Sequence, residues 1–182
     1  VDIVKRTDGT GDTQQTKLIK IIDEKGDEGT ATRKDYIRYT RATQGMWKGE
    51  VQSVIGDSSL GRTGDSYTAY WSSTKKSSNY SISSFNGGEK SHDSITFYDA
   101  NLRKIASISS GNDGTVTRSY LVPKGDDWYR ETIHTKANGQ VSELNSDIKI
   151  DVKKGVITIL IRGKVGGSSL KNQKNVWYRQ HK

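Results

Sequence analysis

Residues 147–164 read DIKIDVKKGVITILIRGK, and this stretch decides the fold class most clearly. In its first half apolar and charged residues alternate, so that Ile148 and Ile150 fall on one side of an extended chain and Lys149 on the other. Lys154-Gly155 then supplies a turn, because glycine readily adopts the positive φ of a tight hairpin. The second half is apolar on both faces. The stretch therefore predicts a β-hairpin whose second strand is central in a sheet.

The same alternation continues along the chain on the N-terminal side of this hairpin. It recurs at intervals of roughly ten to fifteen residues, as is typical of sandwiches and barrels, in residues 66–73, 79–85, 94–98, 115–122 and 128–135. Turn-forming residues separate the segments at Asn86-Gly87-Gly88, Asn112-Asp113-Gly114 and Asn138-Gly139. We expect an all-β fold, an antiparallel β-sandwich whose jelly-roll or Ig-like topology stays open.

The first third of the chain is harder to assign. We expect one domain over residues 1–182, with residues 1–17 as a mobile arm, since 5–17 contain no apolar side chain. Residues 18–22 fit a short N-terminal helix as well as a strand. Residues 35–42 alternate as a strand would. The main β-sandwich is expected over residues 61–182, and whether 1–60 belong to it stays open.

Residues 94–136 resemble, in the rhythm of strands and turns, small extracellular β-sandwich domains of bacterial secreted proteins. The resemblance rests on FYDANLRKI, SGNDGT and VPKGDDWY, which begin at residues 97, 110 and 122. Where such domains have Pro-x-Gly before an aromatic strand entry, this chain has Pro123-Lys124-Gly125 and then Trp128-Tyr129. The resemblance covers about a quarter of the chain and implies the same sandwich fold.

The amino-acid composition favours an extracellular location. The chain has no cysteine, which excludes disulfides and thiol chemistry. It begins at Val1 and its one methionine is Met46, as a removed signal peptide or a trimmed boundary would leave it. Its richness in Ser, Thr, Gly and Tyr favours a secreted protein of a Gram-positive bacterium. No apolar run approaches the roughly 20 residues of a transmembrane segment.

The net charge of +8 comes from the last 34 residues, which hold nine basic side chains against Asp151. Such a concentrated positive field attracts an anionic polymer or glycan surface, a membrane surface or, less favourably, nucleic acid. Lysines also protect the edges of sheets and form solvated faces without any ligand. The binding candidates of this segment are Lys164, Lys171, Lys174 and Arg179.

Aromatic pairs supply the other binding candidates. Trp-Tyr-Arg occurs at 128–130 and again at 177–179, and Tyr70-Trp71 is a similar pair. On a strand the two rings of a pair face opposite sides. One ring is then buried, and the other is either a plain surface residue or a platform for a sugar or nucleobase. The candidates are Trp128, Tyr129, Trp177, Tyr178, Tyr70 and Trp71.

Catalytic and metal-binding patterns are sparse. Glu131, His134 and Arg130 are the residue types of a small ribonuclease, but Glu131 and His134 should point to opposite faces of a strand. No histidine has metal-motif spacing, so we expect no metal site and no cofactor. Calcium is the one alternative, on the acidic turns with Asp23, Glu24, Asp27 and Glu28 or with Gly125, Asp126 and Asp127.

These observations favour a secreted, non-catalytic β-sandwich that binds an anionic or glycan surface such as the bacterial cell envelope. Two alternatives stay open. One is a secreted, membrane-acting, pore-forming toxin, since the Ser/Thr-rich strands of residues 66–85 alternate as membrane hairpins do. The other is a small secreted ribonuclease that uses the three residues named above.

Overall fold

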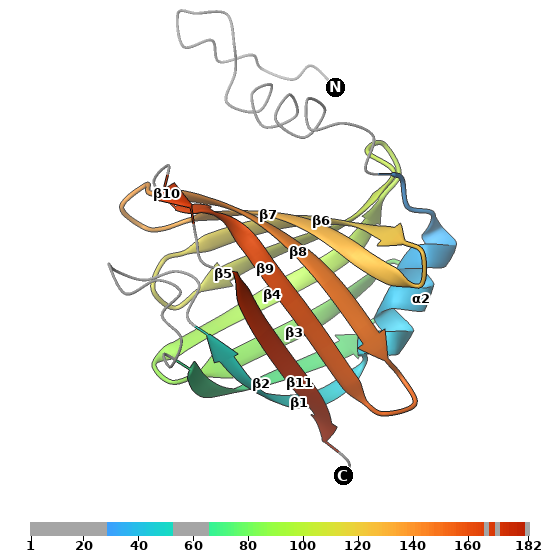
Figure 1. Ribbon diagram of the computed structural model, residues 1–182. Coiled ribbons are helices and arrows are strands. Elements are labelled where there is room, and N and C mark those ends of the chain that lie inside the picture. Colours follow the sequence, from blue (N-terminus) through green and yellow to red (C-terminus); the bar gives the residue numbers. More distant parts are fainter. Residues whose placement is uncertain (1–28, 53–65, 166–167, 170–171, 181–182) are drawn as a thin grey trace, which may run out of the picture.

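The computed structural model describes residues 29–52, 66–165, 168–169 and 172–180 (Figure 1). In this part of the chain one helix precedes eleven strands. They are α2 (Arg33–Thr43), β1 (Gly45–Gln52), β2 (Ser66–Lys75), β3 (Tyr80–Gly87), β4 (Lys90–Asp99), β5 (Lys104–Gly111), β6 (Val116–Lys124), β7 (Asp127–Thr135), β8 (Val141–Asp151), β9 (Val156–Val165), β10 (Ser168–Ser169) and β11 (Gln173–Gln180). The arm predicted at residues 1–17 and the ambiguous residues 18–22 lie outside the described residues.

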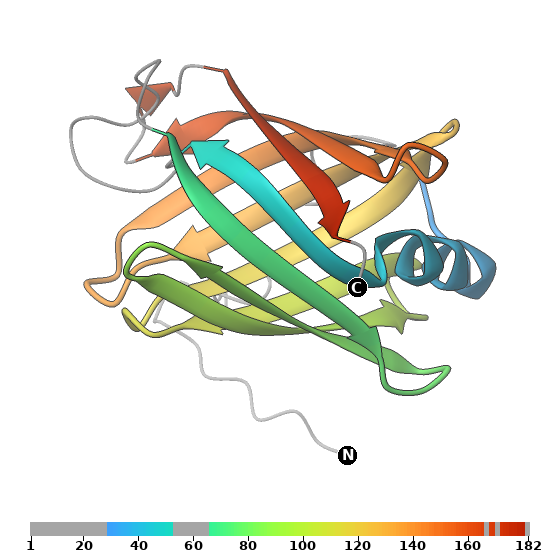
Figure 2. The ribbon, with the colours of Figure 1, turned by 90° about the horizontal axis from the view of Figure 1, so that it is seen from below.

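The strands close into a barrel. From β1 to β9 each strand pairs antiparallel with the next, and β11 lies between β9 and β1. Trp177 of β11 pairs with Ile157 on one side and Gly49 on the other. Ten of the described strands thus form a ring (Figures 1 and 2), and β10 adds a two-residue pairing to the end of β9.

The predicted antiparallel, nearly all-β fold is confirmed, but the arrangement as a sandwich is not. Alternation within a strand shows which residues share a face. It does not show whether the two edge strands of a sheet pair with each other. Here they meet because β11 pairs with both β9 and β1. Among the described strands, the ten of the ring each have a neighbour on both sides, and two packed sheets are replaced by one closed sheet.

Four of the hairpin turns are where the sequence predicts them, those of β3–β4, β5–β6, β7–β8 and β8–β9. Residues of β8 and β9 pair from Asp151↔Val156 outward, which confirms the hairpin of 147–164. Each of these four turns contains one glycine with positive φ, between 62° and 83°, at Gly88, Gly114, Gly139 and Gly155. Glycine adopts this conformation without the steric cost that a Cβ brings, so these turns are encoded locally.

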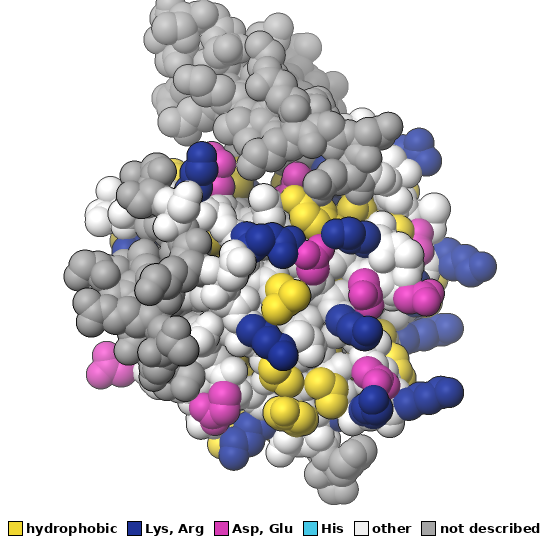
Figure 3. Space-filling model, viewed as in Figure 1, with side chains coloured by type: hydrophobic (Ala, Val, Ile, Leu, Met, Phe, Trp, Pro, Cys, Tyr) yellow, Lys and Arg dark blue, Asp and Glu magenta, His cyan; other side chains and the backbone are white. Residues whose placement is uncertain are grey.

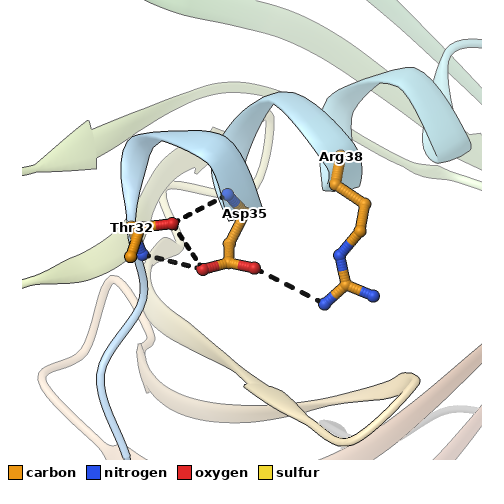
Figure 4. A network of polar contacts seen from close by, with 3 residues as sticks. All are labelled: Thr32, Asp35 and Arg38. Atoms are coloured by element: carbon orange, nitrogen blue, oxygen red, sulfur yellow. Dashed lines mark hydrogen bonds and ion pairs between the residues drawn. The ribbon is translucent and has the colours of Figure 1, made fainter.

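The strand predicted at residues 35–42 is wrong, because this segment lies within α2. A capping box starts the helix (Figure 4): the Asp35 amide donates to Thr32 Oγ1 at 3.2 Å, and the Thr32 amide donates to Asp35 Oδ2 at 3.0 Å. Tyr36, Thr40 and Thr43 are buried at helical spacing. The segment has both periodicities, and the cap together with one buried helical face favours the helix.

Helix α2 lies across one end of the barrel (Figures 1 and 2). The ring of Tyr39 meets Trp128 of β7 edge-on at 5.1 Å between centroids, and the Arg38 guanidinium lies 4.2 Å from the same ring. At the other end of the helix, Arg179 of β11 donates to the carbonyls of Ala42 and Gln44, both at 2.8 Å. These contacts fix the helix over the strand ends, and we call this the helix end of the barrel.

Aromatic residues fill one side of the interior. Trp71 stacks on Trp47 at 6.1 Å and meets Trp177 edge-on at 6.2 Å, and Phe85 meets Trp177 at 6.1 Å. Gly49 makes room for this cluster, since a Cβ there would come within 2.8 Å of the Trp177 ring. This aromatic part of the core lies on β1, β2, β3 and β11, whereas β5, β6, β8 and β9 contribute the aliphatic Ile105, Leu121, Ile148 and Ile157.

Candidate functional site: a cavity inside the barrel

Five consecutive strands, β3 to β7, direct hydroxyl groups into the barrel. These groups bond across strands: Ser83 with Ser94 at 2.6 Å, Thr96 with Ser107 at 3.1 Å, and Ser119 with Thr132 at 2.9 Å. The outer face of the same region carries the exposed Ile82, Ile95 and Ile108, which lie in one row across β3, β4 and β5. Polarity is thus reversed here, with hydroxyls inside and aliphatic side chains outside.

A cavity of about 330 Å³ lies between this hydroxyl wall and an apolar wall. Its volume is near the lower end of the roughly 300–1,000 Å³ typical of small-molecule sites. The apolar wall comes from β8, β9 and β11 and is formed mainly by Leu144, Ile148, Ile157, Ile159, Ile161 and Trp177, with the polar Ser146 and Asn175 between them. A molecule in this space would contact hydroxyl groups on one side and hydrocarbon on the other.

Arg130 of β7 lies on the cavity wall near the helix end, two residues beyond Trp128 on the same face of the strand. Its Nη2 donates to Ser146 Oγ of β8 at 3.4 Å, and its Nε is buried without a hydrogen-bond partner in the described chain. Burial lowers the pKa of Arg130 from its ordinary value. The guanidinium is therefore a desolvated cation, and the described residues leave most of its donors unused.

Tyr39 of α2 also lines the cavity at this end. Burial raises the pKa of Tyr39, and the nearby positive charge of Arg130 partly offsets this effect. The phenol is therefore neutral at ordinary pH and can donate a hydrogen bond. The helix end of the cavity thus offers one cation and two neighbouring hydroxyl groups, those of Tyr39 and Ser146.

Two histidines lie at the opposite end of the cavity. The ring of His92 stacks on Phe85 at 4.5 Å, and His134 Nδ1 bonds to the Thr117 hydroxyl at 2.8 Å. Burial lowers the pKa of His92, and it lowers the pKa of His134 to about 4. Both imidazoles are consequently neutral at pH 7 and do not add positive charge to the cavity.

The structure places some of the aromatic binding candidates inside the barrel and the others on its outer surface. Trp128 and Trp177 are buried, and Trp71 faces the interior, where it and Trp177 line the cavity. Tyr70 and Tyr178 are exposed on the outside, 52% and 56% accessible, and Tyr129 lies near the Lys124 amine, 6.0 Å from it. The prediction that the rings of each pair face opposite sides is confirmed.

Of the basic candidates, Lys164 and Lys174 lie on the outer wall, Arg179 contacts α2 and the buried Trp47 ring, and Lys171 lies outside the described residues. Lys174 is exposed, Lys164 is exposed opposite Glu143 in the β8–β9 register, and Arg179 binds the helix carbonyls. Basic and acidic side chains are interspersed on the face in Figure 3, and Asp147 alone pairs with both Lys124 and Arg162. Opposite charges thus offset part of the +8 segment on neighbouring strands.

The three ribonuclease candidates do not meet at one site. His134 and Arg130 face the interior of β7, whereas Glu131 lies on the outer side, where it pairs with Lys104 at 3.5 Å. Asp126 lies in the β6–β7 turn, Asp127 is the first residue of β7, and Asp23, Glu24, Asp27 and Glu28 lie outside the described residues. Within the described ranges no three His, Asp or Glu side chains gather as metal ligands would. No helix in those ranges is long and apolar enough to cross a membrane.

Sequence reasoning overlooked the hydroxyl wall and Tyr39. A signal was present, because a Ser or Thr recurs at every second position in successive strands, as in Ser81 and Ser83, Ser107 and Ser109, and Thr117 and Ser119. Such alternation is normally attributed to a solvated outer face. Tyr39 could not be placed without the correct assignment of α2.

No model of a known protein family matches this sequence, and no curated protein matches it either.

Proposed function

We propose that this protein binds one small amphipathic molecule inside the barrel. The observation that carries the proposal is the cavity of about 330 Å³ with one hydroxyl wall and one apolar wall. An interior that served stability alone would be filled by apolar side chains at close packing. A polar wall supplies orientation and selectivity, and an apolar wall supplies binding free energy from surface removed from water.

The wall residues suggest how such a ligand lies. Ser119 and Thr132 already bond to each other, and so do Ser83 and Ser94. A hydroxyl has one donor and two acceptor positions, so each pair is satisfied by its own hydrogen bond and still has capacity to bond a ligand. The hydrocarbon part of the ligand would lie against Ile157 and Ile161 on the other wall.

A matched pair of variants on β5 tests the proposal. Ser109 lines the cavity, and its neighbour Ser110 is exposed on the outer face. Ser109→Phe fills part of the cavity with a ring, whereas Ser110→Phe places the same ring outside. Binding of 1-octanol and octanoate is measured by calorimetric titration. We expect Ser109→Phe to weaken both at least about tenfold and Ser110→Phe to bind as the unsubstituted protein does. Absence of binding of both probes to the unsubstituted protein would refute the proposal.

The function predicted from the sequence, binding of an anionic or glycan surface such as a bacterial cell envelope, is a second candidate. One observation favours it. Tyr70 and Tyr178 flank Lys48 in a single row across β2, β1 and β11 on the outer wall, and all three are exposed. Two phenol rings beside an amine suit the face of a sugar and an anionic substituent.

Retention on purified bacterial cell walls tests this second candidate. The double variant Tyr70→Ser with Tyr178→Ser should lose retention, and Tyr80→Ser, which removes an exposed ring from β3, should keep it. Binding by charge should also weaken steeply between low and high salt. Equal retention of the double variant and the Tyr80 variant would count against the row of Tyr70, Lys48 and Tyr178.

A further inference from the structure

We infer that the molecule inside the barrel carries a carboxylate, which the guanidinium of Arg130 binds at the helix end of the cavity. This inference rests on the proposed internal binding function and names the chemical class of the ligand. It follows from three features of the described residues: the unused donors of Arg130, the absence of a protein counter-charge beside it, and the hydroxyl groups of Ser146 and Tyr39 on the same end of the cavity wall.

Arg130 makes less use of its donors than a structural arginine does. A guanidinium has five N–H donors, and here the described chain receives one hydrogen bond from it, the 3.4 Å contact with Ser146. By contrast, Arg179 spends two donors on helix carbonyls at 2.8 Å and lies 4.5 Å from the Trp47 ring. Arg130 lies deep in the barrel but retains accessible surface, and because it lines the cavity that surface faces the cavity.

No carboxylate of the described cavity wall lies near Arg130. Among the lining residues the single acid is Asp113, in the β5–β6 turn at the opposite end, where it accepts a bond from the Thr115 amide at 3.0 Å. The acids closest in sequence point outward, with Glu131 paired to Lys104 and Asp147 to Lys124. A buried cation without a paired anion is costly, so this site has a charge deficit that an anionic ligand would balance.

The surroundings of Arg130 suit a carboxylate in particular. The planar guanidinium fork matches the two oxygens of a carboxylate and can bind both at once. One arginine balances one negative charge, whereas a doubly charged phosphate would leave a buried charge uncompensated. The hydroxyl of Ser146 lies beside the fork, and the neutral phenol of Tyr39 is close enough to feel its charge.

The remainder of β7 sets the direction of the ligand. Thr132 and His134 follow Arg130 on the same inward face, so the line from Arg130 to His134 is about 13 Å long. The carboxylate would lie at the helix end, and the hydrocarbon body would extend toward the histidine end along Ile159 and Ile161 of β9. Lys90 lines the histidine end of the cavity and is the competing cation, which makes it the natural control.

A matched pair of ligands provides the test, because octanoate and 1-octanol share a hydrocarbon chain and differ in the head group. Both are titrated calorimetrically into the unsubstituted protein at pH 7. We expect octanoate to bind at least about tenfold more tightly than octanol, since a charge-assisted pair is stronger than a neutral hydrogen bond.

Four variants assign the preference to a residue. Arg130→Gln should abolish the preference for the acid and leave octanol binding within about threefold, and Arg130→Lys should keep part of it because the charge remains without the fork. Lys90→Gln should keep the full preference. Arg118→Gln, on the exposed outer face of the neighbouring strand β6, should change nothing. Thermal unfolding of each variant verifies that it is folded.

The outcomes separate this inference from the proposed function. Equal affinity of octanoate and octanol for the unsubstituted protein would overturn the carboxylate inference and leave internal binding intact. Loss of the acid preference in Lys90→Gln but not in Arg130→Gln would overturn the placement at the helix end. Failure of both ligands to bind would refute the internal binding function itself.

Discussion

Arg130 and Glu131 are neighbours in β7, yet their charged groups lie on opposite sides of the barrel wall. The guanidinium faces the cavity, and the carboxylate pairs outside with Lys104 at 3.5 Å. Alternation along the strand thus prevents Glu131 from neutralising the buried cation next to it. The same geometry keeps Glu131 away from His134. It explains why three residues that suggest acid–base chemistry in the sequence contribute to two separate environments.

The capping box of α2 should be important for stability. Thr32→Ala removes both the side-chain acceptor for the Asp35 amide and the partner of its carboxylate. We expect a loss of about 1 kcal/mol in the free energy of unfolding, measured by chemical denaturation. Lys34→Ala, an exposed change in the same turn, is the control. Equal stability of the two variants would contradict this role of the cap.

Arg179 should stabilise the packing of α2 against the barrel. Arg179→Ala leaves the carbonyls of Ala42 and Gln44 without their donors and removes the cation from the Trp47 ring. Charged donors to backbone carbonyls suggest a cost of about 2 kcal/mol. Lys174→Ala, an outward change on the same strand, should stay within about 0.5 kcal/mol of the unsubstituted protein. A result within that range for Arg179→Ala would show that α2 is held by other contacts.

Among the glycines in the described strands, Gly163 of β9 should tolerate an added side chain least. It has φ of +155°, and a Cβ there would lie 2.1 Å from the Glu143 carbonyl oxygen. Gly163→Ala should therefore cost about 2–4 kcal/mol, because backbone must move and the conformation is strained. Gly125→Ala adds a Cβ in open space at φ of +62° and should cost only about 1 kcal/mol. Urea denaturation compares them, and equal losses would contradict a close approach of β8 and β9.

His134 should make stability depend on pH in a defined window. Its pKa is lowered to about 4 in the fold, mainly by burial, against an ordinary value near 6.5. Between these values the unfolded chain binds the proton and the folded chain does not. This contribution to stability is therefore present above about pH 6.5 and is lost as pH falls toward 4.

The variant His134→Gln removes this titration. It should lose less stability than the unsubstituted protein between pH 7 and pH 4.5, as measured by urea denaturation at each pH. Thr135→Gln, which changes the next residue on the outward face, should retain the original pH dependence. Parallel pH curves for His134→Gln and the unsubstituted protein would show that His134 is not the group responsible.

Much of the strand pattern could be predicted from local sequence. The turns at Gly88, Gly114, Gly139 and Gly155 require only that glycine tolerates positive φ, and each is where the sequence predicts it. The opposite orientations of Trp128 and Tyr129 follow from the period of two. The prediction failed at residues 35–42, because an eight-residue window fits both periodicities and the deciding Thr32–Asp35 contact precedes the apolar pattern.

The candidate site was less predictable. The sequence singles out Trp71 and Trp128 as binding candidates and Arg130 as a catalytic candidate, without placing them in one cavity. Their common orientation toward one interior depends on which face of each strand is inside. Serine and threonine in alternation suggest a solvated face, and here they line the cavity while Ile95 and Ile108 face outward. Local periodicity shows which residues share a face of a strand, but it does not show which of the two faces lies inside the barrel.

The sequence by itself determined that most of the described chain forms antiparallel strands joined by glycine turns, since these follow from steric preferences within a few residues. Only the tertiary structure decided that the strands close into a barrel, through the pairing of β11 with β1 from the other end of the chain. Closure makes one face of every strand in the ring an interior. That interior brings Tyr39, Arg130 and Ser146 together from three separate elements. The physical reason is that barrel closure depends on the long-range register of the strands, which no local pattern encodes.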